Sequence, residues 1–183
     1  MRIVATISEK AALAGLPFLI IGGNAVNAYG YPRTTTDVDL FVRDSDRRKW
    51  DELIVTLGYR AHQIQRVFHM YNPIPNNLPP VDLMLVDRGT FDKMEINAAE
   101  ITLGGAKVRV PSLRHLIALK LHALRTYLPH RYERDLGDVL VLMQVNKVDL
   151  AAPEYDEIFQ RYATPALITE IERRLAGPES SNP

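Results

Sequence analysis

The chain has 183 residues, enough for one domain or for one domain with a small appendage. Its 22 Lys and Arg residues balance 22 Asp and Glu residues, which argues against a protein that coats DNA or an acidic membrane. The absence of cysteine excludes a disulfide scaffold, a thiolate zinc site and a cysteine nucleophile. No apolar run is long enough to span a bilayer, and residues 1–14 lack the apolar core of a signal peptide, so we expect a cytoplasmic protein without a membrane partner.

Short apolar runs alternate with turn residues over residues 1–110, a pattern typical of a mixed α/β core. Residues 6–14 predict a short helix, and residues 18–21 predict a buried strand that ends at Gly22-Gly23. Asn24 is expected to cap a helix over residues 25–29. Farther along, we expect strands at 37–42, 81–86 and 107–110, a weaker strand at 61–70, helices at about 45–57 and 91–97, and a proline-rich loop at 72–80. The short spacing between strands predicts a small mixed sheet with flanking helices.

Beyond Pro111 the pattern becomes helical. Helices are predicted over residues 112–128, 132–145, 154–162 and 165–175, with Pro129 ending the first of them. Residues 177–183 are expected to form a flexible tail. The sequence therefore predicts an α/β core over residues 1–110 and a helical C-terminal subdomain over residues 111–176.

Two acids at the start of a predicted strand are the first candidates for chemistry. Asp37 and Asp39 are two residues apart, so alternation along a strand puts both carboxylates on one face. Neighbouring carboxylates repel unless a cation lies between them, and Mg2+ (or Mn2+) takes such oxygen ligands. Asp82 joins them if its strand lies beside residues 37–42. The alternative is that Asp37 is a turn acid and Asp39 a solvated edge residue.

Gly22-Gly23 lies between a predicted strand and a predicted helix. Such a turn allows the backbone to approach a phosphate group, although a glycine pair is also common in plain turns. The sequence contains neither a P-loop motif nor the dinucleotide-binding glycine motif.

Lys120 lies in the middle of the apolar stripe of its predicted helix. A lysine in that place either extends its charge to solvent or meets an anion, which would be a triphosphate or a carboxylate. On the next helix, Asp135 flanks the apolar stripe, and Asp138 either pairs with Arg134 on the surface or takes part in the site. Residues 107–134 contain seven Lys and Arg residues against one acid, so this segment could face phosphates.

The stretch from Ile21 to Val42, with Gly-Gly, a helix and then Arg-Thr-Thr-Thr-Asp-Val-Asp, resembles the DNA polymerase β-like nucleotidyltransferase superfamily. It is most similar to the branch of AbiEii-like toxins of abortive-infection systems and related nucleotidyltransferase-like families. The later segments Lys120–Arg125 and Arg134–Asp138 resemble the helical motifs of that branch.

The resemblance implies Mg2+-dependent transfer of a nucleoside monophosphate from an NTP to an acceptor, with tRNA or a protein favoured, and a cognate antitoxin as partner. A non-catalytic nucleotide-binding or partner-binding module of the same fold is the alternative. The resemblance assigns metal binding to Asp37, Asp39 and Asp82, which with Lys120 form the predicted catalytic set. The predicted nucleotide-binding residues are Gly22, Gly23, Asn24, Arg33, Thr36 and Asp135.

Overall fold

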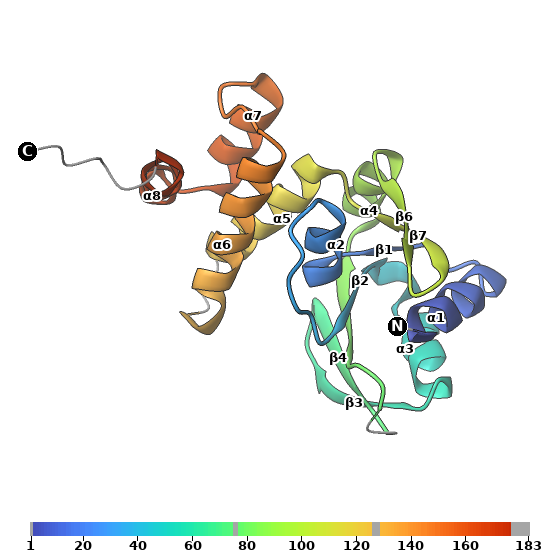
Figure 1. Cartoon of the computed structure of the whole chain (residues 1–183). Helices are drawn as coiled ribbons and strands as arrows, with labels where there is room; N and C mark the ends of the chain where they lie inside the picture. The colour runs from blue at the N-terminus through green and yellow to red at the C-terminus, as the bar shows by residue number, and fades with distance from the viewer. Residues whose placement is uncertain (1, 75–76, 126–128, 177–183) are drawn as a thin grey trace, which may run out of the picture. The chain divides into compact units, whose positions relative to one another are not determined.

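The computed structural model describes residues 2–74, 77–125 and 129–176, and the chain divides into two compact units (Figure 1). The first unit comprises Met1–Ala28 and Pro32–Ser112, and the second comprises Tyr29–Tyr31 and the chain from Leu113 onward. The tail predicted at residues 177–183 lies outside the described residues.

A five-stranded mixed sheet forms the centre of the first unit. Strands β2 and β5 are parallel neighbours in its middle, and the other neighbouring strands are antiparallel. The strand order is β1-β2-β5-β4-β3. This arrangement confirms the predicted mixed α/β fold. The bounds are β1 (Phe18–Ile20), β2 (Val38–Arg43), β3 (Tyr59–Ile64), β4 (Phe68–Pro73) and β5 (Val81–Val86).

Apolar residues on the two central strands explain why β2 and β5 occupy the middle of the sheet. Strand β2 buries all four of its apolar side chains and β5 buries three of its five, as expected for strands covered on both faces. Phe41 of β2 stacks on Phe91 with ring centroids 6.0 Å apart, and Phe18 of β1 meets Trp50 edge-to-face at 5.7 Å. These contacts fix helices against the two faces of the sheet.

Four helices belong to the first unit, and α1 and α3 lie side by side (Figure 1). Asp87 caps α4 by accepting a hydrogen bond from the Thr90 amide at 2.9 Å, and the hydrogen bonds from Thr90 lower the pKa of Asp87. A short 3-10 turn over Asp44–Asp46 precedes α3. The helices are α1 (Arg2–Leu13), α2 (Gly22–Ala28), α3 (Arg47–Thr56) and α4 (Arg88–Ile96).

Three local predictions differ from the structure. The weak strand predicted at 61–70 is a hairpin of β3 and β4, which turns between Ile64 and Phe68. A second hairpin joins β6 (Ala99–Leu103), which was not predicted, to β7 (Ala106–Val110). Asn24 is not a helix cap, because α2 already begins at Gly22 and Asn24 lies inside it.

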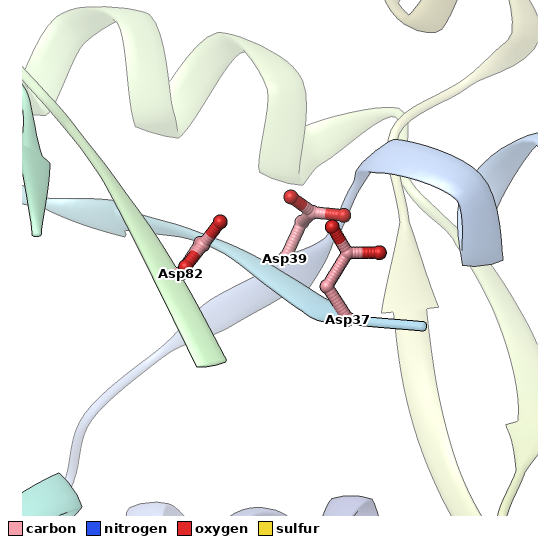
Figure 2. Close-up of side chains that lie close together, drawn as sticks. All are labelled: Asp37, Asp39 and Asp82. Atoms are coloured by element: carbon pink, nitrogen blue, oxygen red, sulfur yellow. The ribbon is translucent and has the colours of Figure 1, made fainter. Parts of the chain in front are cut away.

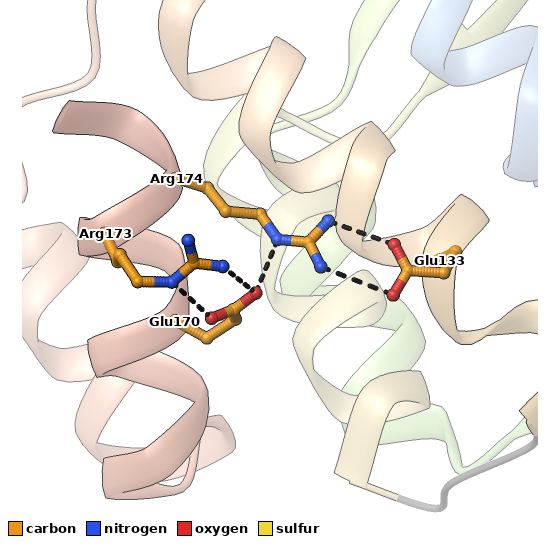
Figure 3. A network of polar contacts seen from close by, with 4 residues as sticks. All are labelled: Glu133, Glu170, Arg173 and Arg174. Carbon is orange, nitrogen blue, oxygen red and sulfur yellow. Dashed lines mark hydrogen bonds and ion pairs between the residues drawn. The ribbon is translucent and has the colours of Figure 1, made fainter. Parts of the chain in front are cut away.

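The described residues of the second unit form four helices. Pro129 is the first residue of α6, where its fixed backbone angle suits a helix start, so α6 begins three residues before the prediction. Arg174 of α8 binds both Glu133 of α6 and Glu170, and Arg173 also binds Glu170 (Figure 3). This network ties α8 to α6. The helices are α5 (Leu113–Arg125), α6 (Pro129–Val145), α7 (Pro153–Tyr162) and α8 (Pro165–Ala176).

Within the described ranges, every helix is too short or too polar to cross a lipid bilayer.

Candidate active site

Three carboxylates meet at the start of the two central strands. The parallel register pairs Asp39 of β2 with Asp82 of β5, and Asp37 lies immediately before β2. One oxygen from each carboxylate lies within 4.8 Å of the others, and all three side chains are half-buried. Figure 2 shows the carboxylates of these three residues turned toward the same side of the sheet. The predicted convergence of Asp37, Asp39 and Asp82 is therefore present. Asp39 is a half-buried residue of a strand with neighbours on both sides, so its interpretation as a solvated edge residue is wrong.

This cluster fits a hard divalent cation. Two oxygens bound to the same Mg2+ at about 2.1 Å are at most about 4.2 Å apart, so the cluster needs only small side-chain movements to share one ion. Two ions about 3.5–4 Å apart, as in two-metal sites, also match its dimensions. The donor set is composed of carboxylate oxygens, which Mg2+ and Mn2+ prefer.

The glycine turn lies directly against the carboxylates. Gly22 has a φ of +62°, and a Cβ atom built on it would lie 1.9 Å from Oδ2 of Asp39. The amide of Ile21 donates a hydrogen bond to the Asp39 carbonyl at 2.9 Å, which fixes the turn beside β2. Only a residue without a side chain fits at position 22, because the Asp39 side chain occupies the space that a Cβ atom would need.

Asn24 and Thr35 support Asp37 from two sides. The buried Asn24 amide donates a hydrogen bond to the Asp37 carbonyl at 3.0 Å, so this side chain orients the backbone rather than capping α2. The Thr35 hydroxyl donates to Oδ1 of Asp37 at 3.0 Å. Thr36, which the sequence analysis selected, is exposed. Thr35 shares the two-residue spacing of Asp37 and Asp39, and that alternation was the signal that could have identified it.

Arg33 lies close to the glycine turn. A Cβ atom built on Gly23 would lie 3.2 Å from Nη1 of Arg33 and 2.7 Å from Oγ1 of Thr35. The guanidinium therefore places a positive charge beside the turn, which supports its selection as a phosphate ligand. Asn27, whose side chain binds the Arg33 backbone, was not among the predicted site residues.

In the second unit, Lys120 is buried between two carboxylates. Its Nζ lies 2.6 Å from Oδ1 of Asp135 and 2.7 Å from Oδ2 of Asp138, and all three residues are at most 6% exposed. Arg131 lies 3.7 Å from Asp135 and adds a second cation. Lys120 thus meets an anion instead of extending to solvent, and the surface pairing of Asp138 with Arg134 is excluded by the burial of Asp138.

The basic segment at residues 107–134 is largely neutralised by acids elsewhere in the chain. Arg114 binds Glu157 at 2.6 Å, and Lys107 binds Glu100 at 3.0 Å. Because Lys120 is also paired with acids, most of the basic side chains of this segment form ion pairs and do not make an uninterrupted basic face. Arg109 also pairs with Glu95 at 3.6 Å, and Arg131 with Asp135 at 3.7 Å.

Comparisons with known proteins agree with this geometry. No curated protein matches the sequence. Among solved structures, ANT(2'')-Ia in complex with adenylyl-2''-tobramycin is similar, with a TM-score of 0.65, 16% identity, and coverage of 88% of this chain and 97% of that one. An antigenic nucleotidyltransferase-like protein from Paracoccidioides brasiliensis has a TM-score of 0.54, 18% identity, and coverage of 93% and 90%. The lincosamide antibiotic adenylyltransferase LnuA has a TM-score of 0.55, 11% identity, and coverage of 76% and 95%.

At these identities the solved structures establish the fold alone. The family comes from the sequence, because the profile described as "Nucleotidyl transferase AbiEii toxin, Type IV TA system" matches residues 9–181. This match spans both compact units, the carboxylate cluster and the Lys120 cluster. The chain therefore belongs to the AbiEii family of nucleotidyltransferase toxins of type IV toxin–antitoxin systems.

Proposed function

We propose that the protein transfers a nucleoside monophosphate from an NTP to an acceptor in a Mg2+-dependent reaction, with pyrophosphate as the leaving group. The observation that carries the proposal is the cluster of Asp37, Asp39 and Asp82, whose oxygens lie within 4.8 Å of one another beside the Gly22 turn. Phosphoryl-type transfer depends mainly on positioning and on neutralising charge, and this arrangement offers both.

The carboxylates of Asp37, Asp39 and Asp82 would hold the ion, with Thr35 orienting Asp37. Bound Mg2+ supplies neutralisation of the phosphate charge, and Mn2+ accepts the same ligands. Gly22 and Gly23 allow the triphosphate close to the backbone. An acceptor hydroxyl or amine attacks the α-phosphorus, the bond to the β-phosphate oxygen breaks, and Asp82 accepts the proton of the attacking group.

In this proposal Arg33 contacts the triphosphate, and Thr36, exposed at the end of the same loop, also contacts the nucleotide. Asn24 acts indirectly, by holding the backbone of Asp37. Lys120 and Asp135 keep the roles that the resemblance implies, catalysis and nucleotide binding. The pairing of Lys120 with two carboxylates adds a physical condition, because a phosphate must compete with Asp135 and Asp138 for its three N–H donors.

For the acceptor, we propose the end of a tRNA. A toxin must modify a component of its own cell, and a nucleic-acid end or a protein satisfies that requirement, whereas an antibiotic does not. Membership of a type IV toxin–antitoxin family also supports a cognate antitoxin as partner.

The test incubates the protein with each of the four α-labelled NTPs and Mg2+, with total tRNA, total protein or an aminoglycoside as acceptor. Asp39→Asn removes one ligand charge at nearly constant volume. Asp46→Asn is the matched control, because the Asp46 side chain makes no capping hydrogen bond to α3. We expect label on tRNA with the wild type and the control, and a loss of at least about 100-fold with Asp39→Asn.

Label on protein or on the aminoglycoside would identify a different acceptor for the same type of reaction. Nucleotide binding without transfer to any acceptor would favour the non-catalytic binding module. Equal labelling by wild type and Asp39→Asn contradicts the proposed role of the carboxylates.

A further inference from the structure

We infer that Asn27 is a positioning residue for the nucleotide, because it fixes the backbone of Arg33 so that the guanidinium lies beside Gly23. The inference rests on the proposed function in one respect, namely that an NTP is the ligand of the glycine turn. It adds a residue whose side chain contacts neither the carboxylate cluster nor, in this proposal, the nucleotide.

Asn27 lies in the last turn of α2 and binds the same residue twice. Its Nδ2 donates to the Arg33 carbonyl at 2.9 Å, and its Oδ1 accepts from the Arg33 amide at 3.0 Å. An asparagine amide satisfies a backbone donor and acceptor together in this way, as a neighbouring strand would. The two bonds hold the residue to α2, the helix that begins at the Gly22-Gly23 turn.

The position of the Arg33 side chain follows from this attachment. Its Nη1 donates to the Thr34 carbonyl at 3.3 Å and approaches to 3.2 Å of a Cβ atom built on Gly23. A guanidinium binds phosphate through parallel N–H donors, so its contribution to binding depends on its orientation. Asn27 removes the backbone freedom that Arg33 would otherwise lose on binding the nucleotide.

The beginning of the same loop is held separately, within the second unit. Nδ2 of Asn146, just after α6, donates to the Tyr29 carbonyl at 3.0 Å and to the Leu142 carbonyl at 2.9 Å. A Cβ atom built on Gly30 would lie 2.9 Å from Cγ1 of Val145. Tyr29 is thus held within the second unit and Arg33 within the first, and three residues separate them along the chain.

A purely structural role for Asn27 makes a different prediction. If the two hydrogen bonds only close the loop, Asn27→Ala lowers the unfolding temperature and changes nucleotide affinity independently of the Arg33 side chain. If Asn27 acts through the guanidinium, its effect on affinity disappears once that guanidinium is removed. A double-mutant cycle separates the two.

The experiment measures the affinity for ATP, GTP, CTP and UTP by calorimetry, with Mg2+ and no acceptor, for wild type, Asn27→Ala, Arg33→Ala and the double variant. For the NTP that the wild type binds best, we expect Asn27→Ala to weaken binding about tenfold, or about 1.4 kcal/mol. Arg33→Ala should weaken it at least as much, and the double variant should match Arg33→Ala within about twofold. Asn97→Ala, an exposed asparagine after α4, is the control and should bind as the wild type does.

Asn27→Asp provides a second variant if Asn27→Ala does not fold. It keeps the acceptor for the Arg33 amide and loses the donor to the Arg33 carbonyl, so binding should weaken less than with alanine. Repulsion of the nucleotide by the new charge would persist in the Arg33→Ala background, whereas a positioning effect would not.

The inference is overturned if Asn27→Ala binds the NTP as tightly as the wild type, or if its tenfold effect persists in the Arg33→Ala background. A wild type that binds none of the four NTPs overturns both the inference and the proposed function. A wild type that binds an NTP but transfers nothing to any acceptor refutes the proposed function, and the cycle still decides the role of Asn27.

Discussion

Alanine at position 22 should damage the carboxylate cluster more than it damages the fold. The backbone at Gly22 has a φ of +62°, and the new Cβ atom would lie 1.9 Å from Oδ2 and 2.5 Å from Cγ of Asp39. Gly15 supplies a matched control, since its φ is +63° and a Cβ atom there meets no atom within 4 Å. The two substitutions share the backbone strain and differ in the collision with Asp39.

The strain of a non-glycine residue in the left-handed region is about 1–2 kcal/mol. In a chain of this length it lowers the Tm by about 2–8 °C. Gly15→Ala should show this loss with unchanged transfer activity. In Gly22→Ala the Asp39 carboxylate must also move by an ångström or more to restore an ordinary contact, and a displacement of that size in a reacting group costs about 100-fold in rate.

Thermal unfolding and transfer of α-labelled NMP, measured on both variants, test this reasoning. The expected result is a similar or somewhat larger fall in Tm for Gly22→Ala than for Gly15→Ala, with transfer lost only in Gly22→Ala. Wild-type transfer by Gly22→Ala would show that Asp39 does not need its present position, and would refute the argument from the glycine turn.

Three further predictions follow from the ion pairs and the metal site. Lys120→Met removes the cation that lies between the buried Asp135 and Asp138, although Arg131 remains near Asp135. It should lower the free energy of unfolding, measured in urea, by about 3–5 kcal/mol, and a variant as stable as the wild type contradicts the buried pairing. The Arg173 and Arg174 hydrogen bonds lower the pKa of Glu170 from 4.5 to about 2, so its contribution to stability is present above pH 4.5 and is lost as the pH falls toward 2. The unfolding midpoint of wild type should therefore fall more steeply than that of Glu170→Gln over this range, and parallel curves would refute the pairing of Glu170 with Arg173 and Arg174 within α8. Mg2+ at about 100 times its dissociation constant should raise the free energy of unfolding of the wild type by about 2.7 kcal/mol, and that of Asp39→Asn much less. In EDTA the variant should be the more stable protein, because one of the repelling carboxylate charges is gone. An equal stabilisation of both proteins by Mg2+ would place the ion elsewhere.

The sequence predicts the carboxylate cluster well because two simple periodicities determine it. Alternation along β2 places Asp37 and Asp39 on one side, and the apolar character of β5 makes it a central strand, so that Asp82 comes opposite Asp39. The family motif and the apolar stripe around Lys120 can likewise be recognised within single segments of the sequence.

Other features depend on tertiary contacts that no local pattern contains. The pairing of Lys120 with Asp138 joins two helices, and a helical wheel of α6 leaves Asp138 off the apolar stripe. The strand β6 exposes most of its side chains, so it lacks the apolar face that marks a strand. Asn24 was expected to cap α2, but its side chain binds the Asp37 carbonyl, a contact that no local pattern indicates. Thr35, for which no role was predicted, binds the Asp37 carboxylate.

The most direct test of metal-dependent nucleotidyl transfer compares α-labelled with γ-labelled NTP under identical conditions, with tRNA, Mg2+ and either wild type or Asp39→Asn. The account predicts that the α-label becomes attached to the acceptor, that the γ-label is released in pyrophosphate, and that both events require Mg2+ and Asp39. Attachment of the γ-label, or equal attachment of the α-label by the Asp39→Asn variant, would contradict it.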